Sequence, residues 1–341
     1  MLRVLSSVTQ GRNLDRVTTI TDNDVVLRSD TFNQQDLEEI LQKGRPRYFV
    51  SDVFSQAYFN DIEIVCLPLF AAAETKRILS QSNMSDEFIT DFAFNFMINK
   101  KQINRFLCVK LVECFDLKDF DYTWSGVDNN FDMSPILAEL DSLGDQSFMD
   151  DLTKSCMMQS IKLLPRYIEH PGQIVNNVQI GNYGGNTWTW NNGLQNMFSK
   201  SAISLITESV AWQKASIFSE KTLFSVLGLT FPIWIGGYEQ AKEFANLGFD
   251  TFDDIIDHSY QSYDTLIQRC FYAVEKNKHL LSDKALVTEL RLKNKHRLLA
   301  NREFLITGGV DRFVSQKIAQ LPADLQQVMP EILRHLRYPN L

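Results

Sequence analysis

An α/β fold with two domains is predicted by three features of this 341-residue sequence. Short apolar runs alternate with helical segments, as in parallel sheets covered by helices. The apolar runs at residues 92–99 and 201–206 lack a strict alternation of polar and apolar side chains, which is typical of strands buried on both faces. The length, with 44% apolar and 11% aromatic residues, is sufficient for two domains with a sizeable core.

The composition limits the classes of protein to which this chain can belong. The net charge of -8 and a pI near 5.2 argue against a general basic field that coats nucleic acid, although they leave a local basic groove open. The amino terminus lacks an apolar core of signal-peptide length, and no run approaches the roughly 18 apolar residues of a membrane span. The five cysteines include no Cys-x-x-Cys pair, so we predict buried reduced thiols in a cytoplasmic protein.

The first domain is predicted to be small and to span residues 1–88. Its expected strands are apolar runs at residues 3–8, 24–29, 47–54 and 62–70, and its expected helices lie at residues 36–43 and 71–82. Gly44 and Pro46 end the first of these helices. The polar segment at residues 81–87 is the best candidate for a linker to the next domain.

The second domain is predicted to span residues 89–305, with an insertion at about 127–200. A strand at residues 92–99, a helix at 105–115 and a strand near residue 121 form its first βαβ unit. Within the insertion, a helix is expected at residues 150–163. The glycine-rich and aromatic tract at residues 180–193 is expected to be a loop or hairpin. It serves either as a lid or acceptor-contacting surface, or as a surface hairpin packed onto the domain through Trp188 and Trp190.

The carboxyl-terminal third is predicted to be mainly helical. One long helical run is expected at residues 283–305, and a helical tail at residues 306–341 is expected to break at its prolines. The basic residues of the long run are Arg291, Lys293, Lys295, His296, Arg297 and Arg302. They form either a solvated face or a surface that contacts phosphates.

The stretch at residues 201–252 reads as strand, acidic turn, helix, strand and glycine turn, which is how an α/β domain builds a ligand crevice. Ser219 is a candidate amino-terminal cap of the helix, with Glu220 and Lys221 in the first turn. A cation or a helix amino terminus can hold a diphosphate, and a carboxylate can accept the ribose hydroxyl protons. A capped helix with a solvated Glu and Lys is the alternative.

Several pieces of this stretch occur together in a known order. ITES is followed by FSEKTLFSVLGLTFPIWIGG and then by LGFDTFDD. This order resembles the donor half of the fucosyltransferase-type GT-B glycosyltransferases, over about residues 91–275 and apart from the insertion. The matching residues are Glu208, Ser209, Phe218, Glu220, Lys221 and the strand from Pro232 to Gly236. Ser219 departs from the Thr usual in that family, and the GFDTF ending is more similar to phage and marine bacterial proteins of uncertain acceptor.

The resemblance implies a GT-B-like fold of two Rossmann-like domains and a nucleotide-sugar donor of the UDP or GDP type, with no other cofactor. It implies that Arg105, at the start of the first donor-domain helix, holds the diphosphate together with Lys221. Phe218 would stack beside the base, Glu220 would hold the ribose, and Glu208 with Ser209 and Ser219 would shape the donor site.

Transfer by inversion needs a general base for the acceptor hydroxyl. The candidates are Asp52, after an expected strand, and Glu74, at the start of an expected helix, although both could be solvated carboxylates. A metal-dependent donor site would use an Asp-x-Asp pair, which the sequence has at residues 22–24 and 119–121. We predict no metal. The sequence contains no Gly-x-Gly-x-x-Gly, P-loop or Gly-x-Ser-x-Gly motif, which argues against hydride transfer, ATP hydrolysis and serine hydrolysis.

Three hypotheses about the acceptor and the activity stay open. Phage-like character suggests a hydroxymethylated pyrimidine in DNA, modified in the cytoplasm of the host. Its phosphate contacts would come from Lys100, Lys101, Lys293, Lys295 and Arg297. The second hypothesis is a glycan or lipopolysaccharide acceptor. The third is a non-catalytic protein that binds nucleotides or carbohydrates.

Overall fold

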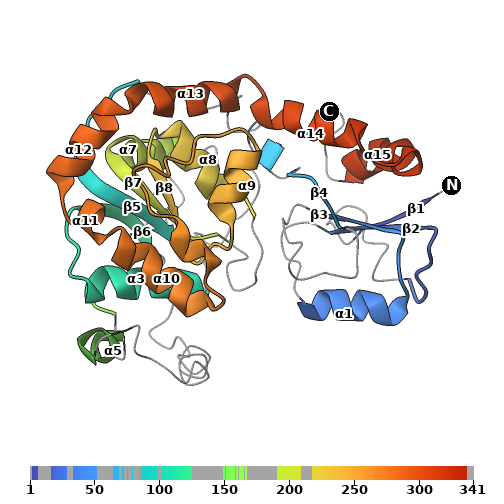
Figure 1. The fold of residues 1–341 in the computed structure, drawn as a ribbon, viewed down its shortest axis with the longest axis horizontal. Coiled ribbons are helices and arrows are strands. Elements are labelled where there is room, and N and C mark those ends of the chain that lie inside the picture. Colours follow the sequence, from blue (N-terminus) through green and yellow to red (C-terminus); the bar gives the residue numbers. More distant parts are fainter. Residues whose placement is uncertain are drawn as a thin grey trace.

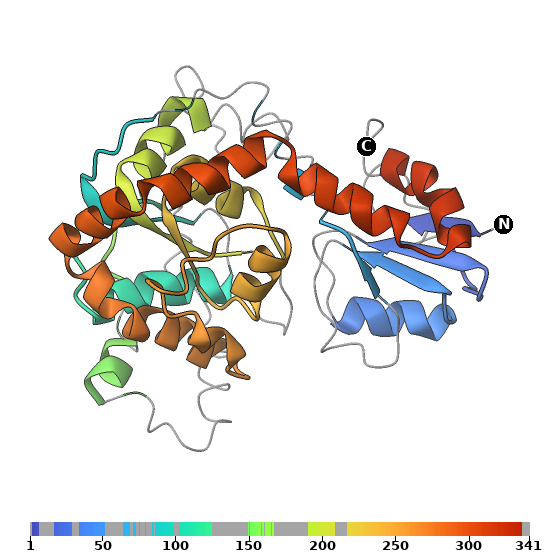
Figure 2. The same ribbon diagram turned by 45° about the horizontal axis from the view of Figure 1, so that its top comes forward.

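The chain is described by a computed structural model with two parallel four-stranded sheets and helices around both, as in Rossmann-like α/β folds (Figures 1 and 2). The α/β class predicted from the sequence is therefore confirmed. The described residues are 2–6, 17–28, 34–51, 64–68, 71–72, 75, 79, 84, 86–98, 102–124, 149, 151–157, 159, 161–164, 166, 190–208 and 217–335.

The first sheet contains only parallel strands in the order β1-β2-β3-β4. Its strands are β1 (Arg3–Ser6), β2 (Asp24–Arg28), β3 (Tyr48–Ser51) and β4 (Ile64–Cys66). Helix α1 (Gln34–Lys43) covers one face of this sheet (Figure 1). The predicted stop at Gly44 is confirmed: its φ of +136° favours glycine, and a Cβ there would lie 1.9 Å from the carbonyl oxygen of Ile20.

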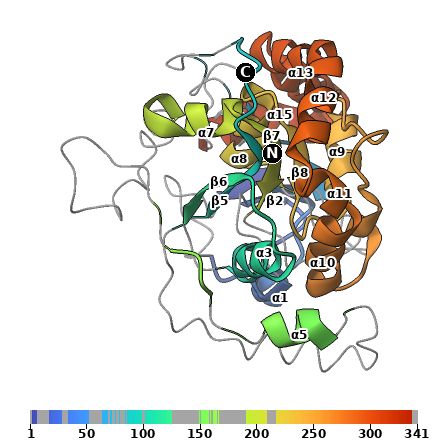
Figure 3. The same cartoon turned by 90° about the vertical axis from the view of Figure 1, so that its left-hand side faces the viewer.

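The second sheet has the order β6-β5-β7-β8 and is also parallel. Its strands are β5 (Phe92–Ile98), β6 (Phe120–Trp124), β7 (Ser201–Ile206) and β8 (Phe231–Trp234). Figure 3 shows α3 (Ile103–Cys114) and α10 (Leu266–Lys276) below this sheet and α7 (Gln195–Ser199) above it, with α12 (Lys284–Lys293) and α13 (Lys295–Ile306) also on the upper side. Helix α8 (Glu220–Leu227) packs on the same side as α7. Both faces of the sheet are therefore buried, as its sequence pattern predicted.

The end of the glycine-rich tract is not a hairpin. Residues Trp190–Leu194 form the π-helix η3, which leads directly into α7. Trp190 is buried, and its ring lies 5.1 Å from that of Phe224 on α8 and 6.0 Å from that of Phe198. The indole anchors the end of the insertion to the second sheet. Trp190 therefore packs onto the domain, as predicted for the surface hairpin. Trp188 lies outside the described residues.

The long helical run is two helices, α12 (Lys284–Lys293) and α13 (Lys295–Ile306), which meet at Asn294. The run follows α11 (Lys278–Leu281). The expectation that Arg291 belongs to an exposed basic face is wrong, because this residue is 0% exposed. Its guanidinium donates to oxygens of Leu229 (3.0 Å), Ile89 (2.9 Å), Thr90 (3.2 Å), Ser199 (2.7 Å) and Gly228 (3.1 Å). Arg291 thus fastens the connection between the two halves to the second sheet.

The helical tail returns to the first sheet. Helices α14 (Gly309–Ala319) and α15 (Ala323–His335) lie over the face opposite α1 (Figure 1). The Tyr48 hydroxyl donates to Asp324 at 3.2 Å, and Arg47 is paired with the same carboxylate at 2.9 Å. The expected break at Pro330 is wrong, because this proline lies inside α15. The first half is therefore completed by chain from both ends of the sequence.

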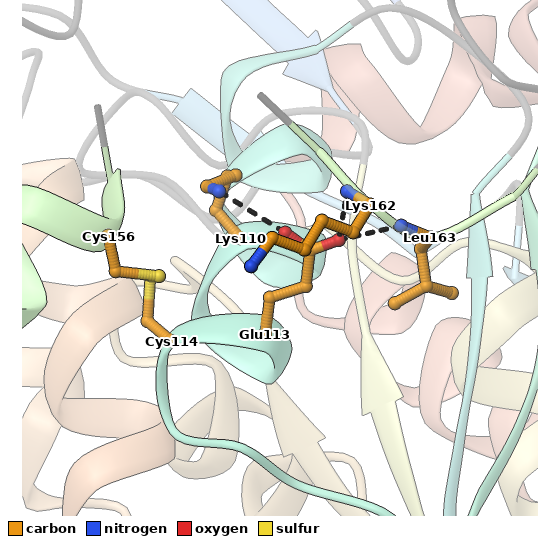
Figure 4. The surroundings of a disulfide bond; sticks show 6 residues. All are labelled: Lys110, Glu113, Cys114, Cys156, Lys162 and Leu163. Carbon is orange, nitrogen blue, oxygen red and sulfur yellow. Dashed lines mark hydrogen bonds and ion pairs between the residues drawn. A yellow bond between two sulfur atoms is a disulfide. The ribbon is translucent and has the colours of Figure 1, made fainter. Parts of the chain in front are cut away.

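Two of the five cysteines do not match the predicted reduced state. Cys114, at the end of α3, forms a disulfide with Cys156 on α5 (Asp151–Met157) (Figure 4). Their Cα atoms are 5.5 Å apart, which is within the range that a disulfide can span. Beside it, the Glu113 carboxylate accepts from the backbone amides of Lys162 (2.6 Å) and Leu163 (2.7 Å). These contacts attach the insertion to α3. Cys66, Cys108 and Cys270 carry reduced thiols.

The carboxyl ends of the two sheets point towards one another. In Figure 1, β1 starts at the outer end of the first half and runs towards the second half. The amino ends of β5 and β7 lie beside α12, on the outer side of the second half, where Arg291 donates to Ser199. Because all strands of each sheet are parallel, the carboxyl ends of the strands lie on the facing edges. Among the described residues, no helix has the length and apolar character needed to cross a membrane.

The left-handed backbone at Gly248, just after α9 (Gln240–Asn246), leads to a prediction about stability. Gly248 has a φ of +103°, and a Cβ there would lie 2.9 Å from the ring of Phe304 on α13. Gly248→Ala is therefore expected to lower the free energy of unfolding by about 1–3 kcal/mol, as measured by urea denaturation. Ala245→Ser, at an exposed position of α9, is the control and should change it by less than about 0.5 kcal/mol. Equal stability of the two variants would contradict the prediction.

Candidate functional site

The strand order identifies one edge where a ligand crevice is expected. From β5 the chain moves outward to β6, whereas β7 and β8 lie on the other side of β5. In open α/β sheets, ligands bind outside the carboxyl ends of the strands at such a reversal. Here the flanking strands are β5 and β7. They are followed by the amino terminus of α3 and by Glu208, respectively.

Arg105 lies in the first turn of α3 and is only 2% exposed. Within the part of the chain that the structure describes, its Nε atom has no hydrogen-bond partner. Burial lowers the pKa of Arg105, and the nearby charges of Glu220 and Glu208 oppose this shift. An arginine nevertheless keeps its charge in proteins. A buried guanidinium with an unpartnered donor is costly, and a bound anion would supply the missing acceptor.

Asn104, next to Arg105, holds three chain segments together. Its side-chain amide donates to the backbone oxygen of Glu208 at 3.0 Å and to that of Ile235 at 3.5 Å. Glu208 follows β7, and Ile235 follows β8. The amino terminus of α3 is therefore fixed against the ends of both strands.

Glu208 is buried at the base of α8. Its Oε1 accepts from the backbone N of Ser219 at 3.1 Å and from Thr222 Oγ1 at 2.6 Å, and Trp234 Nε1 donates to the same Thr222 hydroxyl at 3.0 Å. Burial raises the pKa of Glu208, while the charge of Lys221 opposes the shift. This carboxyl group anchors the start of α8 beneath the sheet edge.

Ser219 is the amino-terminal cap of α8, as predicted, and its Oγ accepts from the backbone N of Lys221 at 3.3 Å. The Lys221 ammonium is paired with Glu220 at 3.0 Å, and the two side chains are 6% and 18% exposed. Burial alone would raise the pKa of Glu220, but the charge and hydrogen bond of Lys221, with the charge of Arg105, lower it overall. Glu220 is thus an ionised carboxylate between two cations.

Phe218 lies in the core. It is 3% exposed, and its ring lies 5.7 Å from that of Phe244. Stacking on a base would require this ring to become accessible, so that role stays a prediction. Ser209 lies outside the described residues.

In the described residues, three helices of eight or more residues begin at this edge. They are α3, α8 and α10, the last capped by Thr265, whose Oγ1 accepts from the backbone N of Gln268 at 3.2 Å. Helix amino termini carry partial positive charge and unpaired N–H groups. Together with Arg105 and Lys221 they place positive charge at this edge, beside the carboxylate of Glu220, in a chain of net charge -8. The arrangement can hold a di-anionic group such as a diphosphate.

Of the residues predicted to contact nucleic acid, the three that the structure describes, Lys293, Lys295 and Arg297, lie away from this edge. Lys293 and Lys295 are exposed at the junction of α12 and α13, where Lys295 Nζ lies 4.7 Å from the centre of the Phe88 ring. Arg297 donates to Asp250, Asp254 and Asn294, and its five N–H groups are all used in these bonds. Asp250 and Asp254 come from the GFDTFDD motif, so Arg297 has a clear structural role. Lys100, Lys101, Asp52 and Glu74 lie outside the described residues.

The two Asp-x-Asp pairs lie at the amino-terminal edges of the two sheets, away from the facing carboxyl edges. Asp24 begins β2 and is paired with Arg3 at 2.6 Å. Asp119 precedes β6, and Asp121 is paired with Arg166. In the part of the chain that the structure describes, no three His, Cys, Asp or Glu side chains form a group that could hold a metal ion.

A pocket of about 250 Å³ lies away from the candidate site. Glu87, Ile89, Asn191, Gly193, Gln195, Asn196, Ser199 and Lys200 line it. Lys200 directly precedes β7, so the pocket is at the amino end of the second sheet, opposite Arg105. Lys200 is already paired with Asp91 at 3.0 Å.

Sequence reasoning missed Asn104, Thr222 and Arg269. Arg269 is buried on α10 and donates to the backbone oxygens of Gly236 (2.9 Å), Tyr263 (3.0 Å) and Asp264 (2.9 Å). Thr222 could have been found, because it directly follows the Ser-Glu-Lys motif. No sequence signal marks Arg269, whose role depends on carbonyl groups that only the fold brings to it.

The raised pKa of Glu208 leads to a test of stability against pH. The protonated form is favoured in the folded protein, so its contribution is present below the ordinary pKa of 4.5 and is lost as the pH rises through the higher folded pKa. Glu208→Gln keeps an acceptor and removes the ionisable group. The free energy of unfolding of this variant, minus that of the wild type, is therefore expected to increase between pH 4 and pH 8. Urea denaturation across this range measures it, and a difference independent of pH would contradict the prediction.

No protein family, no curated protein and no solved structure matches this chain.

Proposed function

We propose that this chain is a GT-B-type glycosyltransferase that binds a nucleotide sugar at the carboxyl edge of its second sheet. The observation that carries the proposal is Arg105, a buried cation at a helix amino terminus with an unpartnered Nε atom. Lys221, at the amino terminus of α8, is the second cation of the same edge. The resemblance of the Glu208 to Phe252 stretch to fucosyltransferase-type donor domains supports the same assignment.

Each polar side chain has a role in this proposal. Arg105 and Lys221 bind the diphosphate, and Lys221 exchanges its bond to Glu220 for one to phosphate oxygen. Glu220, whose lowered pKa keeps it ionised, accepts the ribose hydroxyl protons. Glu208 and Ser219 fix the start of α8 so that these groups are in place before the donor binds.

The acceptor hydroxyl would enter from the first half. Ser51, the residue before Asp52, ends β3 at the edge that points towards the second sheet, which supports Asp52 over Glu74 as the general base. No metal or other cofactor is part of the proposed reaction, and we propose that it takes place in the cytoplasm, or in the host cytoplasm if a phage encodes the chain.

A saccharide acceptor is favoured over DNA. Arg297 is committed to Asp250 and Asp254, and Arg302 is paired with Asp86, so two cations of the expected phosphate-contacting face are neutralised. Binding to duplex DNA with hydroxymethylated pyrimidines that weakens steeply with salt would reverse this preference.

A thermal-shift screen of UDP-, GDP-, ADP-, CMP- and dTDP-sugars tests the proposal. A donor at about 100 times its Kd stabilises the folded protein by roughly 2.7 kcal/mol, which is a readily measured rise in Tm. Release of the free sugar from the donor that binds would separate an enzyme from a non-catalytic binding protein. Absence of any shift across the whole panel would contradict the proposal.

A further inference from the structure

We infer that Asn104 makes the crevice selective for diphosphates over monophosphates, because its side-chain amide sets the position of Arg105 relative to Lys221. This inference rests on the proposed function and deepens it. It names nucleoside diphosphate sugars, rather than nucleoside monophosphate sugars, as the class of donor. Asn104 is a positioning residue in this inference, because it acts through Arg105 and not through a contact of its own with the ligand.

The two cations of the site come from opposite faces of the second sheet. Arg105 lies in the first turn of α3, below the sheet in Figure 3, and Lys221 lies in the first turn of α8, which packs on the other side with α7. Both cations act on one anionic group. Burial would raise the pKa of Glu220, but the charges of Lys221 and Arg105 both lower it. The two cations therefore converge although their helices do not pack together.

This convergence is what a diphosphate requires. A diphosphate presents one phosphate group to each cation, so its affinity depends on the distance between them. A monophosphate can bind at either cation, so its affinity depends on that distance much less. Selectivity for diphosphates therefore requires a device that fixes the start of α3 relative to the start of α8.

A series of hydrogen bonds connects the two helix starts. Beside Arg105, the Asn104 amide donates to the backbone oxygen of Glu208 at 3.0 Å. The Glu208 carboxyl group accepts from the backbone N of Ser219 at 3.1 Å. Ser219 in turn caps α8 by accepting from the backbone N of Lys221 at 3.3 Å. The bond from Asn104 joins α3 to this series.

The same amide also fixes the neighbouring strand end. Asn104 Nδ2 donates to the backbone oxygen of Ile235, after β8, at 3.5 Å. Asn104 is only 3% exposed, so water cannot readily replace either of its bonds. The first turn of α3 is thus held in one position before a ligand arrives, which lowers the cost of binding. A displacement of about 1 Å in a group that binds substrate can cost roughly 100-fold in rate, so loss of this anchor should be measurable.

Isothermal titration tests the selectivity with UDP, GDP, ADP and dTDP, each beside the matching monophosphate. The wild type is expected to bind a diphosphate at least 10-fold more tightly than its monophosphate. Asn104→Ala should weaken binding of that diphosphate roughly 10-fold and change binding of the monophosphate by less than about 2-fold. Asn104→Leu, with the same branched shape but no donor, should give the same result and replaces the alanine variant if the latter does not fold.

A double variant and a matched control separate positioning from a general loss of structure. In Arg105→Met, adding Asn104→Ala should change the diphosphate affinity by less than about 2-fold, because the cation that Asn104 positions is absent. Asn277→Ala removes another buried amide, which donates to the backbone oxygens of Asp257 (3.1 Å) and Ala273 (3.0 Å) at the far end of α10. This control should lower the Tm and leave both affinities unchanged.

The failure of this inference is distinguishable from failure of the proposed function. The role of Asn104 is overturned if its variants bind the diphosphate as tightly as the wild type, weaken both nucleotides equally, or add their full effect to that of Arg105→Met. A wild type that binds a diphosphate no better than its monophosphate overturns it too. All of these results leave nucleotide binding by the crevice intact. A wild type that binds none of the eight nucleotides contradicts the proposed function as well, whatever the variants do.

Discussion

Replacing Arg291 with alanine is expected to lower the free energy of unfolding by roughly 4 kcal/mol or more, the largest stability effect foreseen for a single residue in this protein. The side chain is fully buried, and burial lowers its pKa to about 10. Its guanidinium binds five oxygens, four of which are backbone carbonyl oxygens. Truncation leaves these carbonyls without partners and opens a cavity beneath the connection between the halves.

Chemical denaturation of three variants measures this effect. Arg291→Lys keeps the charge but replaces a planar fork with a point donor, so an intermediate loss is expected. Lys293→Ala, two residues further along α12 and exposed, is the matched control and should change stability by less than about 0.5 kcal/mol. A loss below about 1 kcal/mol for Arg291→Ala would refute the structural role.

Replacing Arg105 with methionine is expected to weaken binding of the nucleotide sugar by at least 100-fold, about 2.7 kcal/mol, without lowering the Tm of the free protein. The free protein gains little from this cation, because it is buried and its Nε atom finds no hydrogen-bond partner among the described residues. The same cation gains its partner when a diphosphate binds. Loss of binding with retained or increased stability is the signature of a residue kept for function.

A second buried cation on the same helix supplies the control. Lys110 is paired with Glu113 at 3.2 Å at the other end of α3. Lys110→Met should lower stability, because it leaves Glu113 without this partner, and should leave the affinity for the donor unchanged. The proposed role of Arg105 fails if Arg105→Met binds as tightly as the wild type, or if both variants lose stability and affinity together.

Much of the fold could be predicted from local signals. Strands β5 and β7 are apolar runs without alternation, and they lie at the predicted residues. Ser219 caps α8 because a serine oxygen at that position can accept from the amide two residues later. Gly248 ends the region of α9 because its backbone is left-handed. Each of these features depends on residues close together in the sequence, so the sequence alone determined them.

The candidate site could be predicted only in part. The sequence pointed to Arg105, Glu208, Glu220 and Lys221, and the structure brings these residues together at the edge between β5 and β7. It also buries Phe218, which the resemblance placed beside the base, and it brings Arg269 to the same edge. Whether an aromatic ring is buried depends on packing between distant segments, and the sequence contains no signal for this.

Only the tertiary structure decided which partners the charged residues and cysteines have. In the sequence, Arg291 and Arg297 both belong to a basic helical run. In the structure, Arg291 binds carbonyl groups in the core, whereas Arg297 binds Asp250 and Asp254. Cys114 and Cys156 are 42 residues apart and meet because α5 packs on α3. Helical periods, strands and caps follow from neighbours along the chain. The partner of a buried cation or thiol depends on which other groups are left without a partner once the two sheets are assembled.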